Sequence, residues 1–118
     1  MSKRVSILGS TGSIGVNSLE VISHLKSKMD VIYITAHSNS DLLVKQALNF
    51  KPKAICISDE SKYNDVKKYL KNTPIKIYKG REGLLEIASR NDVDIMLNGL
   101  VGASGMEPTL KAIHAGVD

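Results

Sequence analysis

The sequence contains little sulfur and few aromatic side chains. Its only cysteine, Cys56, excludes a disulfide within the chain. Because Cys56 stands in the apolar run Ala54–Ile57, we expect a buried thiol that acts as a small apolar side chain. Tryptophan is absent, and aromatic residues make up 4% of the 118 positions. Aliphatic side chains therefore have to build the core, in a chain long enough for one domain.

Long apolar runs and a secretory signal are also missing. No segment approaches the ~18 consecutive apolar residues of a membrane-spanning helix. Lys3 and Arg4 lead into only four mainly apolar positions before Gly9, which is too short for a signal peptide. We expect no membrane partner and a reducing, cytoplasmic location.

The basic residues are not accompanied by the aromatic side chains on which single-stranded nucleic acids stack. The net charge is +4, and lysines are most frequent between Lys62 and Lys79. No platform of stacking aromatic side chains is interleaved with them. The run is typical of a solvated helix face, so we expect no nucleic-acid partner.

Short β-branched runs alternate with segments of helical periodicity. The alternation predicts strands at 5–8, 31–36, 54–57, 75–78 and 94–97. It predicts helices at 13–25, from Ser40–Asp41 to a stop at Pro52, and at 59–70, 82–90 and 106–114. Such alternation indicates βαβ units, hence a doubly wound, Rossmann-type α/β fold with a mainly parallel sheet and helices on both faces. The run at 75–78 alternates like an edge strand.

The end of the sequence suggests a longer protein. Gly116 is well placed to end the last helix, and residues 117–118 would then turn towards another strand. We therefore expect residues 1–118 to be one domain, cut from a longer chain before its next strand.

The stretch "ILGSTGSIG", residues 7–15, places three glycines three residues apart between a predicted strand and a predicted helix. In a dinucleotide-binding unit, Gly9 would permit the turn out of the strand and Gly12 the approach of a pyrophosphate. Gly15 would let the helix pack closely on the sheet. Glycines at turns and close contacts are the alternative explanation, but the strand–turn–helix context favours dinucleotide binding.

The same stretch supplies hydrogen-bond donors for a phosphate. N–H groups from Thr11 to Ile14 would point at the anion from a helix N-terminus, where the helix dipole is favourable. We expect the hydroxyls of Ser10, Thr11 and Ser13 to add further donors.

The end of the second predicted strand indicates which cofactor is used. NAD sites usually carry an Asp or Glu there for the ribose 2′-hydroxyl, whereas this chain has His37, Ser38 and Asn39. A 2′-phosphate would meet no repulsion and would find amide and hydroxyl donors, which favours NADP. His37 could stack on the adenine or touch the phosphate, or it could be a solvated loop histidine.

A second glycine-rich segment, "NGLVGASG" at residues 98–105, follows the last predicted strand. If that strand lies beside the first, the segment borders the crevice where the strand order reverses. Its small residues would let a nicotinamide ribose lie against the backbone. The alternative is a loop whose glycines adopt positive φ.

Together, "ILGSTGSIG" and "NGLVGASGMEPTLKAIHAG" resemble the N-terminal NADPH-binding domain of the 1-deoxy-D-xylulose 5-phosphate reductoisomerase family. The resemblance implies that NADPH is bound through the glycine loop by Thr11, Gly12, Ser13 and Ile14. It also implies that His37, Ser38 and Asn39 handle the adenosine 2′-phosphate. Asn39 matches the family's usual asparagine, whereas His37 and Ser38 depart from its usual glycine or basic residue.

The family's enzyme isomerises 1-deoxy-D-xylulose 5-phosphate and reduces the product with NADPH to 2-C-methyl-D-erythritol 4-phosphate, a step of non-mevalonate isoprenoid biosynthesis. The resemblance implies a divalent metal, Mg²⁺ or Mn²⁺, a sugar-phosphate substrate and a homodimer for the full-length enzyme. The family's Asn-Lys-Glu segment and metal-binding acids follow the point where this sequence stops. We therefore assign no catalytic or metal residue here and expect the 118-residue chain alone to be inactive.

Three other interpretations deserve comparison. Tyr63 and Lys67 form a Y-x-x-x-K pair, but it lies too early in the fold for a short-chain dehydrogenase. The glycine loop also fits a semialdehyde dehydrogenase-like enzyme or a non-catalytic NAD(P)-sensing module. Asp92 and Asp94 precede a strand at its amino end, away from the crevice, so we expect a structural role for them.

Overall fold

The computed structural model of the chain describes residues 3–25 and 28–99. Within them, strands and helices alternate as the sequence predicts. The strands are β1 (Lys3–Leu8), β2 (Met29–Ala36), β3 (Ala54–Ile57), β4 (Lys76–Lys79) and β5 (Ile95–Asn98). The helices are α1 (Ser13–Ser23), α2 (Ser40–Phe50), the 3₁₀ turn η1 (Glu60–Lys62), α3 (Tyr63–Leu70) and α4 (Gly80–Ala88).

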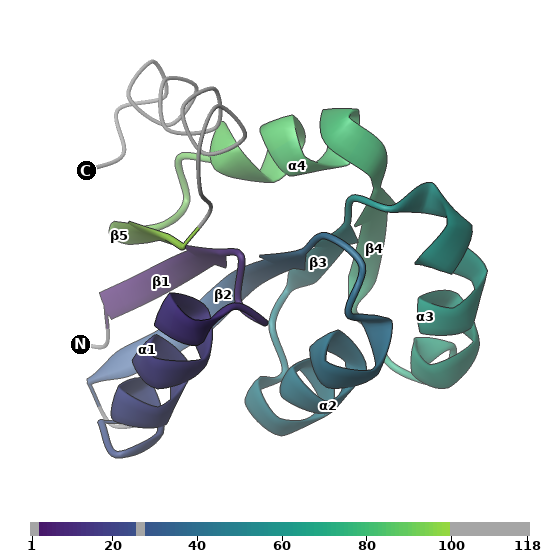
Figure 1. Ribbon diagram of the computed structural model, residues 1–118. Coiled ribbons are helices and arrows are strands. Elements are labelled where there is room, and N and C mark those ends of the chain that lie inside the picture. Colours follow the sequence, from purple (N-terminus) through teal and green to yellow (C-terminus); the bar gives the residue numbers. More distant parts are fainter. Residues whose placement is uncertain (1–2, 26–27, 100–118) are drawn as a thin grey trace.

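The strands form one parallel sheet in the order β4-β3-β2-β1-β5. The chain moves outward from β1 to β4 and then returns through α4 to β5, on the other side of β1. Helices α1 and α2 cover one face of the sheet and α4 covers the opposite face (Figure 1). The predicted doubly wound α/β fold is confirmed, and β4 is the edge strand that its alternation predicted.

Two apolar clusters fill the space between the sheet and its helices. The larger one joins side chains of β1, β2 and β3 to α1, α2 and α3, and the smaller one lies under α4. Apart from Tyr33 and Cys56, the buried hydrophobic side chains of the described residues are aliphatic, as the scarcity of aromatics required. Cys56 belongs to the smaller cluster and is fully buried, and this burial raises the pKa of its thiol to about 12. The prediction of a buried thiol that acts as a small apolar side chain is confirmed.

Three helices differ from their predicted bounds. The helix expected over 13–25 ends at Ser23. The helix expected over 59–70 starts as η1, because the Asp59 carboxylate accepts the Ser61 N–H (3.1 Å) and caps a tighter turn before α3. The helix expected over 82–90 begins earlier, at Gly80, and ends at Ala88. The helix expected over 106–114, and the chain end, lie outside the described residues.

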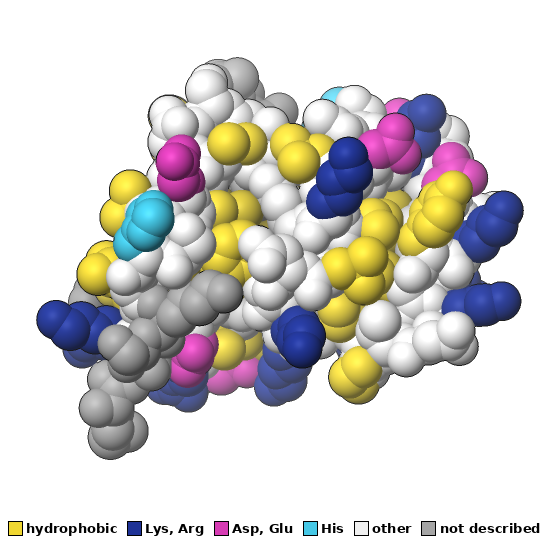
Figure 2. All heavy atoms as spheres, turned by 90° about the horizontal axis from the view of Figure 1, so that it is seen from below, with side chains coloured by type: hydrophobic (Ala, Val, Ile, Leu, Met, Phe, Trp, Pro, Cys, Tyr) yellow, Lys and Arg dark blue, Asp and Glu magenta, His cyan; other side chains and the backbone are white. Residues whose placement is uncertain are grey.

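The surface carries its charges in a dispersed pattern. On the face covered by α1 and α2, Lys and Arg side chains are spread among acidic and apolar ones (Figure 2). Helix α3 buries Val66 and Leu70 and exposes its lysines, so the predicted solvated face is confirmed. Lys67 Nζ lies 5.9 Å from the centroid of the Tyr63 ring on this outer surface, away from the glycine turn. No helix among the described residues is long and apolar enough to cross a membrane.

Asp92, shortly before β5, bonds to one side chain of β2 and to one side chain just before β3. Its Oδ2 accepts hydrogen bonds from the Tyr33 hydroxyl (2.7 Å) and from Lys53 Nζ (3.1 Å). Burial raises the pKa of Tyr33 to about 12, and the bond to Asp92 adds to this. Burial also disfavours the Asp92 carboxylate, but the bonds from Tyr33 and Lys53 outweigh this effect and lower its pKa. Asp94 pairs with Arg4 (3.4 Å), so the predicted structural role of both aspartates is confirmed.

We predict that Asp92→Ala lowers the free energy of unfolding by about 1–3 kcal/mol, because it leaves the buried Tyr33 hydroxyl without its acceptor. The Asp92 pKa is lowered in the folded protein, so its contribution is present above the ordinary carboxyl pKa of about 4 and is lost as pH falls below it. Urea unfolding between pH 3 and 7 measures both effects. Glu86→Ala, which removes an exposed partner of Arg90, is the control. An equal loss in both variants would contradict the prediction.

Candidate cofactor site

Three loops meet at the carboxyl ends of the central strands. The glycine turn follows β1, His37 to Asn39 follow β2, and Gly99 follows β5. Strands β2 and β5 are the two neighbours of β1, so the three loops lie at one edge of the sheet. The strand order reverses at β1, and this is where doubly wound folds bind their ligands.

The glycine turn is fixed by hydrogen bonds to the neighbouring β2. Gly9 has a φ of 76°, which lets the chain leave β1 sharply. Its N–H donates to Thr35 Oγ1 (3.0 Å), and the Ser10 N–H donates to the Thr35 carbonyl (2.7 Å). Both Ser10 and Thr35 are buried, so these bonds are shielded from water.

Ser10 does not offer its hydroxyl to a ligand. Its Oγ donates to Gln46 Oε1 (2.6 Å), and its carbonyl accepts from Gln46 Nε2 (2.8 Å). The prediction that Ser10 adds a donor for a phosphate is therefore wrong, because α2 places a buried amide beside it. Gln46 lies on the buried side of α2 with Leu43 and Ala47. A polar residue among these apolar positions was a sequence feature that could have indicated a buried hydrogen bond here.

The N-terminus of α1 points its free backbone donors towards the crevice. Gly12 is the N-cap residue, and no side chain caps the helix. The first bond of the helix runs from the Val16 N–H to the Gly12 carbonyl (2.8 Å), so the N–H groups of residues 13–15 have no partner in the helix. The Gly12 N–H, which the sequence predicted to face the anion, donates to the Gly9 carbonyl instead (3.2 Å). Ser13 and Ile14 are exposed and Thr11 is half-buried. The arrangement can bind an anion through main-chain donors.

The glycines at 12 and 15 have different physical roles. A Cβ added at Gly12 would meet nothing nearer than the Gly9 carbonyl oxygen at 3.6 Å, so the fold itself leaves room for a side chain. A Cβ at Gly15 would lie 2.5 Å from Ser10 Cα and nearer still to the Gly9 carbonyl oxygen. Gly15 thus allows close packing, as predicted, although its contact is with the turn rather than with the sheet.

The residues after β2 lie at the start of α2. His37, Ser38 and Asn39 are all exposed. Asn39, rather than the expected Ser40–Asp41, caps α2: its Oδ1 accepts the Leu42 N–H (3.2 Å). Since the carbonyl oxygen is used in the cap, the Asn39 amide N–H groups remain to face a ligand.

Sequence reasoning missed a carboxylate beside this loop. Asp59 follows β3, and its N–H donates to the His37 carbonyl (2.7 Å). Hydrogen bonds from the Ser61 hydroxyl (2.6 Å) and N–H lower the pKa of Asp59, and His37 and Lys62 nearby act in the same direction. Only the pairing of β3 with β2 brings Asp59 here, so no local pattern could have revealed it.

Gly99 closes the third side of the turn. Its N–H donates to the Leu8 carbonyl (2.7 Å), and an added Cβ would lie 3.2 Å from the Gly9 carbonyl oxygen. Gly99 does not adopt a positive φ, so close packing explains this glycine better than the loop alternative. The other residues of the segment, 100–105, lie outside the described part of the chain.

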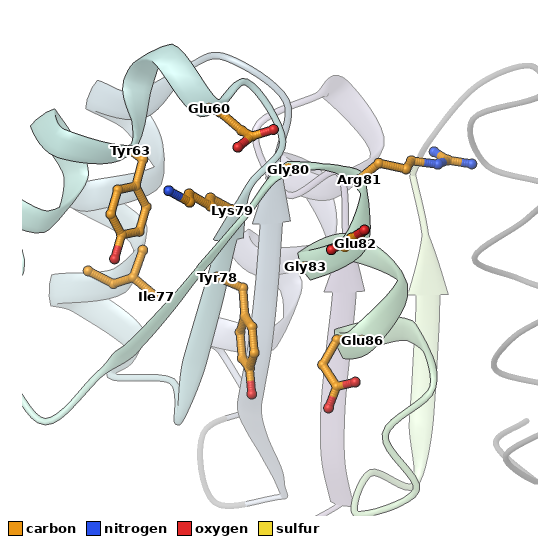
Figure 3. A pocket seen from close by; sticks show the side chains of 10 residues that line it. All are labelled: Glu60, Tyr63, Ile77, Tyr78, Lys79, Gly80, Arg81, Glu82, Gly83 and Glu86. Carbon is orange, nitrogen blue, oxygen red and sulfur yellow. The ribbon is translucent and has the colours of Figure 1, made fainter.

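A separate cavity of about 610 Å³ lies at the far edge of the sheet, between α3, β4 and α4 (Figure 3). Lys79 points across it to the Tyr63 ring, 4.8 Å from the centroid. Its charged lining is mixed: three glutamates, Glu60, Glu82 and Glu86, with Lys79 and Arg81. Strands β2 and β3 separate β4 from β1, so this cavity is no part of the site at the glycine turn.

Comparison with known proteins identifies the family. The family model of 1-deoxy-D-xylulose 5-phosphate reductoisomerase matches residues 5–118. The chain belongs to the 1-deoxy-D-xylulose 5-phosphate reductoisomerase family. The reductoisomerase of Chloroherpeton thalassium is 46% identical over 116 residues, and that of Phocaeicola vulgatus is 43% identical. These alignments cover 98% of this chain and 30% of each relative, so the chain spans about a third of their length.

Solved reductoisomerases share the fold. The enzyme from Zymomonas mobilis in complex with NADPH superposes with a TM-score of 0.94 at 32% identity, over 99% of this chain and 31% of that one. A reductoisomerase in complex with NADPH, fosmidomycin and magnesium superposes with a TM-score of 0.92 at 35% identity, over 98% and 28%. Membership of the reductoisomerase family decides against the semialdehyde dehydrogenase-like alternative.

We predict that Gly15→Ala lowers the free energy of unfolding by about 3 kcal/mol or more, because the methyl group would overlap backbone atoms of the turn. Gly12→Ala is the matched control. Gly12 has a φ of −78° and open space around it, so its replacement should change stability by less than about 1 kcal/mol. Thermal unfolding followed by circular dichroism measures the stability of both variants. Equal melting temperatures of the two variants would contradict the conclusion that close packing requires a glycine at position 15 and not at position 12.

Proposed function

We propose that this chain is the NADPH-binding part of a 1-deoxy-D-xylulose 5-phosphate reductoisomerase. The whole enzyme would isomerise 1-deoxy-D-xylulose 5-phosphate and reduce it to 2-C-methyl-D-erythritol 4-phosphate. The observation that carries the proposal is the uncapped N-terminus of α1, set beside open space at Gly12 where the strand order reverses. The close structural relative in complex with NADPH supports it.

The pyrophosphate would be bound by Thr11, Gly12, Ser13 and Ile14. Backbone N–H groups at the start of α1 donate to its oxygens, and the positive end of the helix dipole stabilises its charge. The half-buried Thr11 and exposed Ser13 hydroxyls lie in the same turn and can donate as well. Because the turn is fixed before a ligand arrives, little ordering opposes binding.

The 2′-phosphate would be bound by His37, Ser38 and Asn39. The Ser38 hydroxyl and the Asn39 amide can donate to it, and hydrogen bonds to a charged group are stronger than neutral ones. Both bonds from Ser61 go to Oδ1 of Asp59, and this carboxylate follows β3 rather than standing at the end of β2, where NAD sites carry their acid. The hydroxyl and amide donors at the end of β2 therefore favour NADPH over NADH.

The remaining parts of the reaction would belong to the rest of the enzyme. When bound, NADPH supplies a hydride, and the site described here orients its adenosine and pyrophosphate. Among the described residues, no group of three His, Cys, Asp or Glu side chains could hold a metal ion. We propose that binding of the divalent metal, Mg²⁺ or Mn²⁺, binding of the sugar phosphate and dimer formation require the full-length protein. We propose the cytoplasm as its location.

The chain should bind NADPH at least about tenfold more tightly than NADH, the size expected for hydrogen bonds to one additional charged group. Isothermal titration calorimetry with each nucleotide measures the ratio. Tighter binding of NADH would contradict the assignment of the 2′-phosphate site.

Gly12→Val should abolish NADPH binding and leave the fold intact. The branched side chain would fill the space left for a phosphate, while the fold itself offers it room. The same titration measures binding, and far-UV circular dichroism checks folding. Normal affinity in a folded Gly12→Val protein would remove the glycine turn from the cofactor site.

The 118-residue chain should show no reductoisomerase turnover with NADPH, substrate and Mg²⁺ present. Orientation of the sugar beside the nicotinamide accounts for up to ~7–11 kcal/mol of such a barrier, and this chain spans about a third of its relatives. The decrease in NADPH absorbance measures turnover. Activity of the purified chain would show that the catalytic groups lie within these 118 residues.

A further inference from the structure

Beyond the residues that would touch NADPH, we infer that Gln46 is a positioning residue, coupling the pyrophosphate turn to the 2′-phosphate loop through α2. The inference rests on the proposed function and concerns a side chain that touches no cofactor atom itself. Gln46 is 7% exposed, and its amide makes both of its bonds to Ser10, the residue before Thr11.

The orientation of the amide follows from Ser10. A backbone carbonyl can only accept, so the Gln46 NH₂ group has to face it (2.8 Å). The amide oxygen is then left facing the Ser10 hydroxyl, which has to donate (2.6 Å). With the Ser10 N–H bound to Thr35, every polar group of Ser10 is held by β2 or α2. The turn therefore has no freedom to shift relative to α2 without breaking a buried hydrogen bond.

Helix α2 connects the Gln46–Ser10 pair to the loop that would bind the 2′-phosphate. Asn39 caps α2, and Gln46 follows it by seven residues, about two turns of helix, on the same side. The helix is rigid over this distance and is packed on the sheet through Leu43 and Ala47, both fully buried. The Gln46–Ser10 pair thus sets the spacing between the start of α1 and the start of α2.

This spacing matters for a ligand that engages both helix starts. NADPH would contact α1 with its pyrophosphate and the α2 loop with its 2′-phosphate, whereas NADH lacks the second anchor. Loosening the Gln46–Ser10 pair should therefore weaken NADPH more than NADH. A residue that only stabilised the fold would leave the ratio of the two affinities in the folded protein unchanged.

The test compares Gln46→Leu with the unaltered chain and with Val66→Ala. Gln46→Leu leaves both Ser10 groups buried without partners, so we expect the Kd for NADPH to rise about 10-fold to 100-fold and the preference over NADH to fall about tenfold. Val66, fully buried in α3, lies outside the site. Its truncation should lower the melting temperature and leave the preference unchanged. Calorimetric titration with both nucleotides, on protein that circular dichroism shows to be folded, gives the ratios.

Ser10→Ala is the second variant, used should Gln46→Leu fail to fold. It removes the hydroxyl and keeps the bond between the Gln46 amide and the Ser10 carbonyl, so the preference should fall by about threefold. An unchanged preference in a folded Gln46→Leu or Ser10→Ala protein would overturn the inference, as would an equal fall in Val66→Ala. If the unaltered chain bound neither nucleotide, the proposed function itself would fail, and that measurement comes first.

Discussion

The start of α1 can lie against the end of β1 only because residue 15 has no side chain. Even a methyl group there would overlap backbone atoms of Ser10 and Gly9. This close approach aims the first N–H groups of the helix at the crevice between the loops after β1, β2 and β5. The glycine at 12, by contrast, is required by nothing inside the protein. Gly15 is thus required by the fold, whereas Gly12 is available for contact with a ligand.

The glycine turn offers mainly backbone donors, and the polar side chains that hold it, Thr35 and Gln46, are buried. Thr35 and Gln46 form buried hydrogen bonds to Gly9 and Ser10, and these bonds hold the turn in place. Buried hydrogen bonds of this kind are costly to leave unmade, so the turn has one favoured position. A rigid frame of side chains around a surface of main-chain groups suits a diphosphate, which offers only oxygen acceptors.

Periodicity was sufficient to predict a doubly wound, mainly parallel sheet, because short apolar runs alternating with amphipathic helices allow few topologies. The pairing of β5 with β1 entered only as a condition. They could not predict contacts that depend on packing between distant segments. Ser10 was interpreted as a ligand donor because its partner, Gln46, lies on another helix 36 residues away. Asp59 was overlooked because it reaches His37 only through the pairing of β3 with β2. Asn39 stays a predicted contact of the 2′-phosphate, and its capping bond to Leu42 was not predicted because the sequence pattern placed the helix start one residue later.

The position of β1 between β2 and β5 also has a consequence for synthesis on the ribosome. Strand β1 emerges first and can pair with β2 early, but its other neighbour follows about 90 residues later, as the Arg4–Asp94 contact illustrates. At a synthesis rate of roughly 5–20 residues per second, one edge of β1 stays unpaired for about 5–20 s. An unpaired apolar strand edge is a template for pairing with other chains. The nascent protein therefore passes through a period in which β1, a strand with both neighbours in the finished sheet, has one edge open to pairing with other chains.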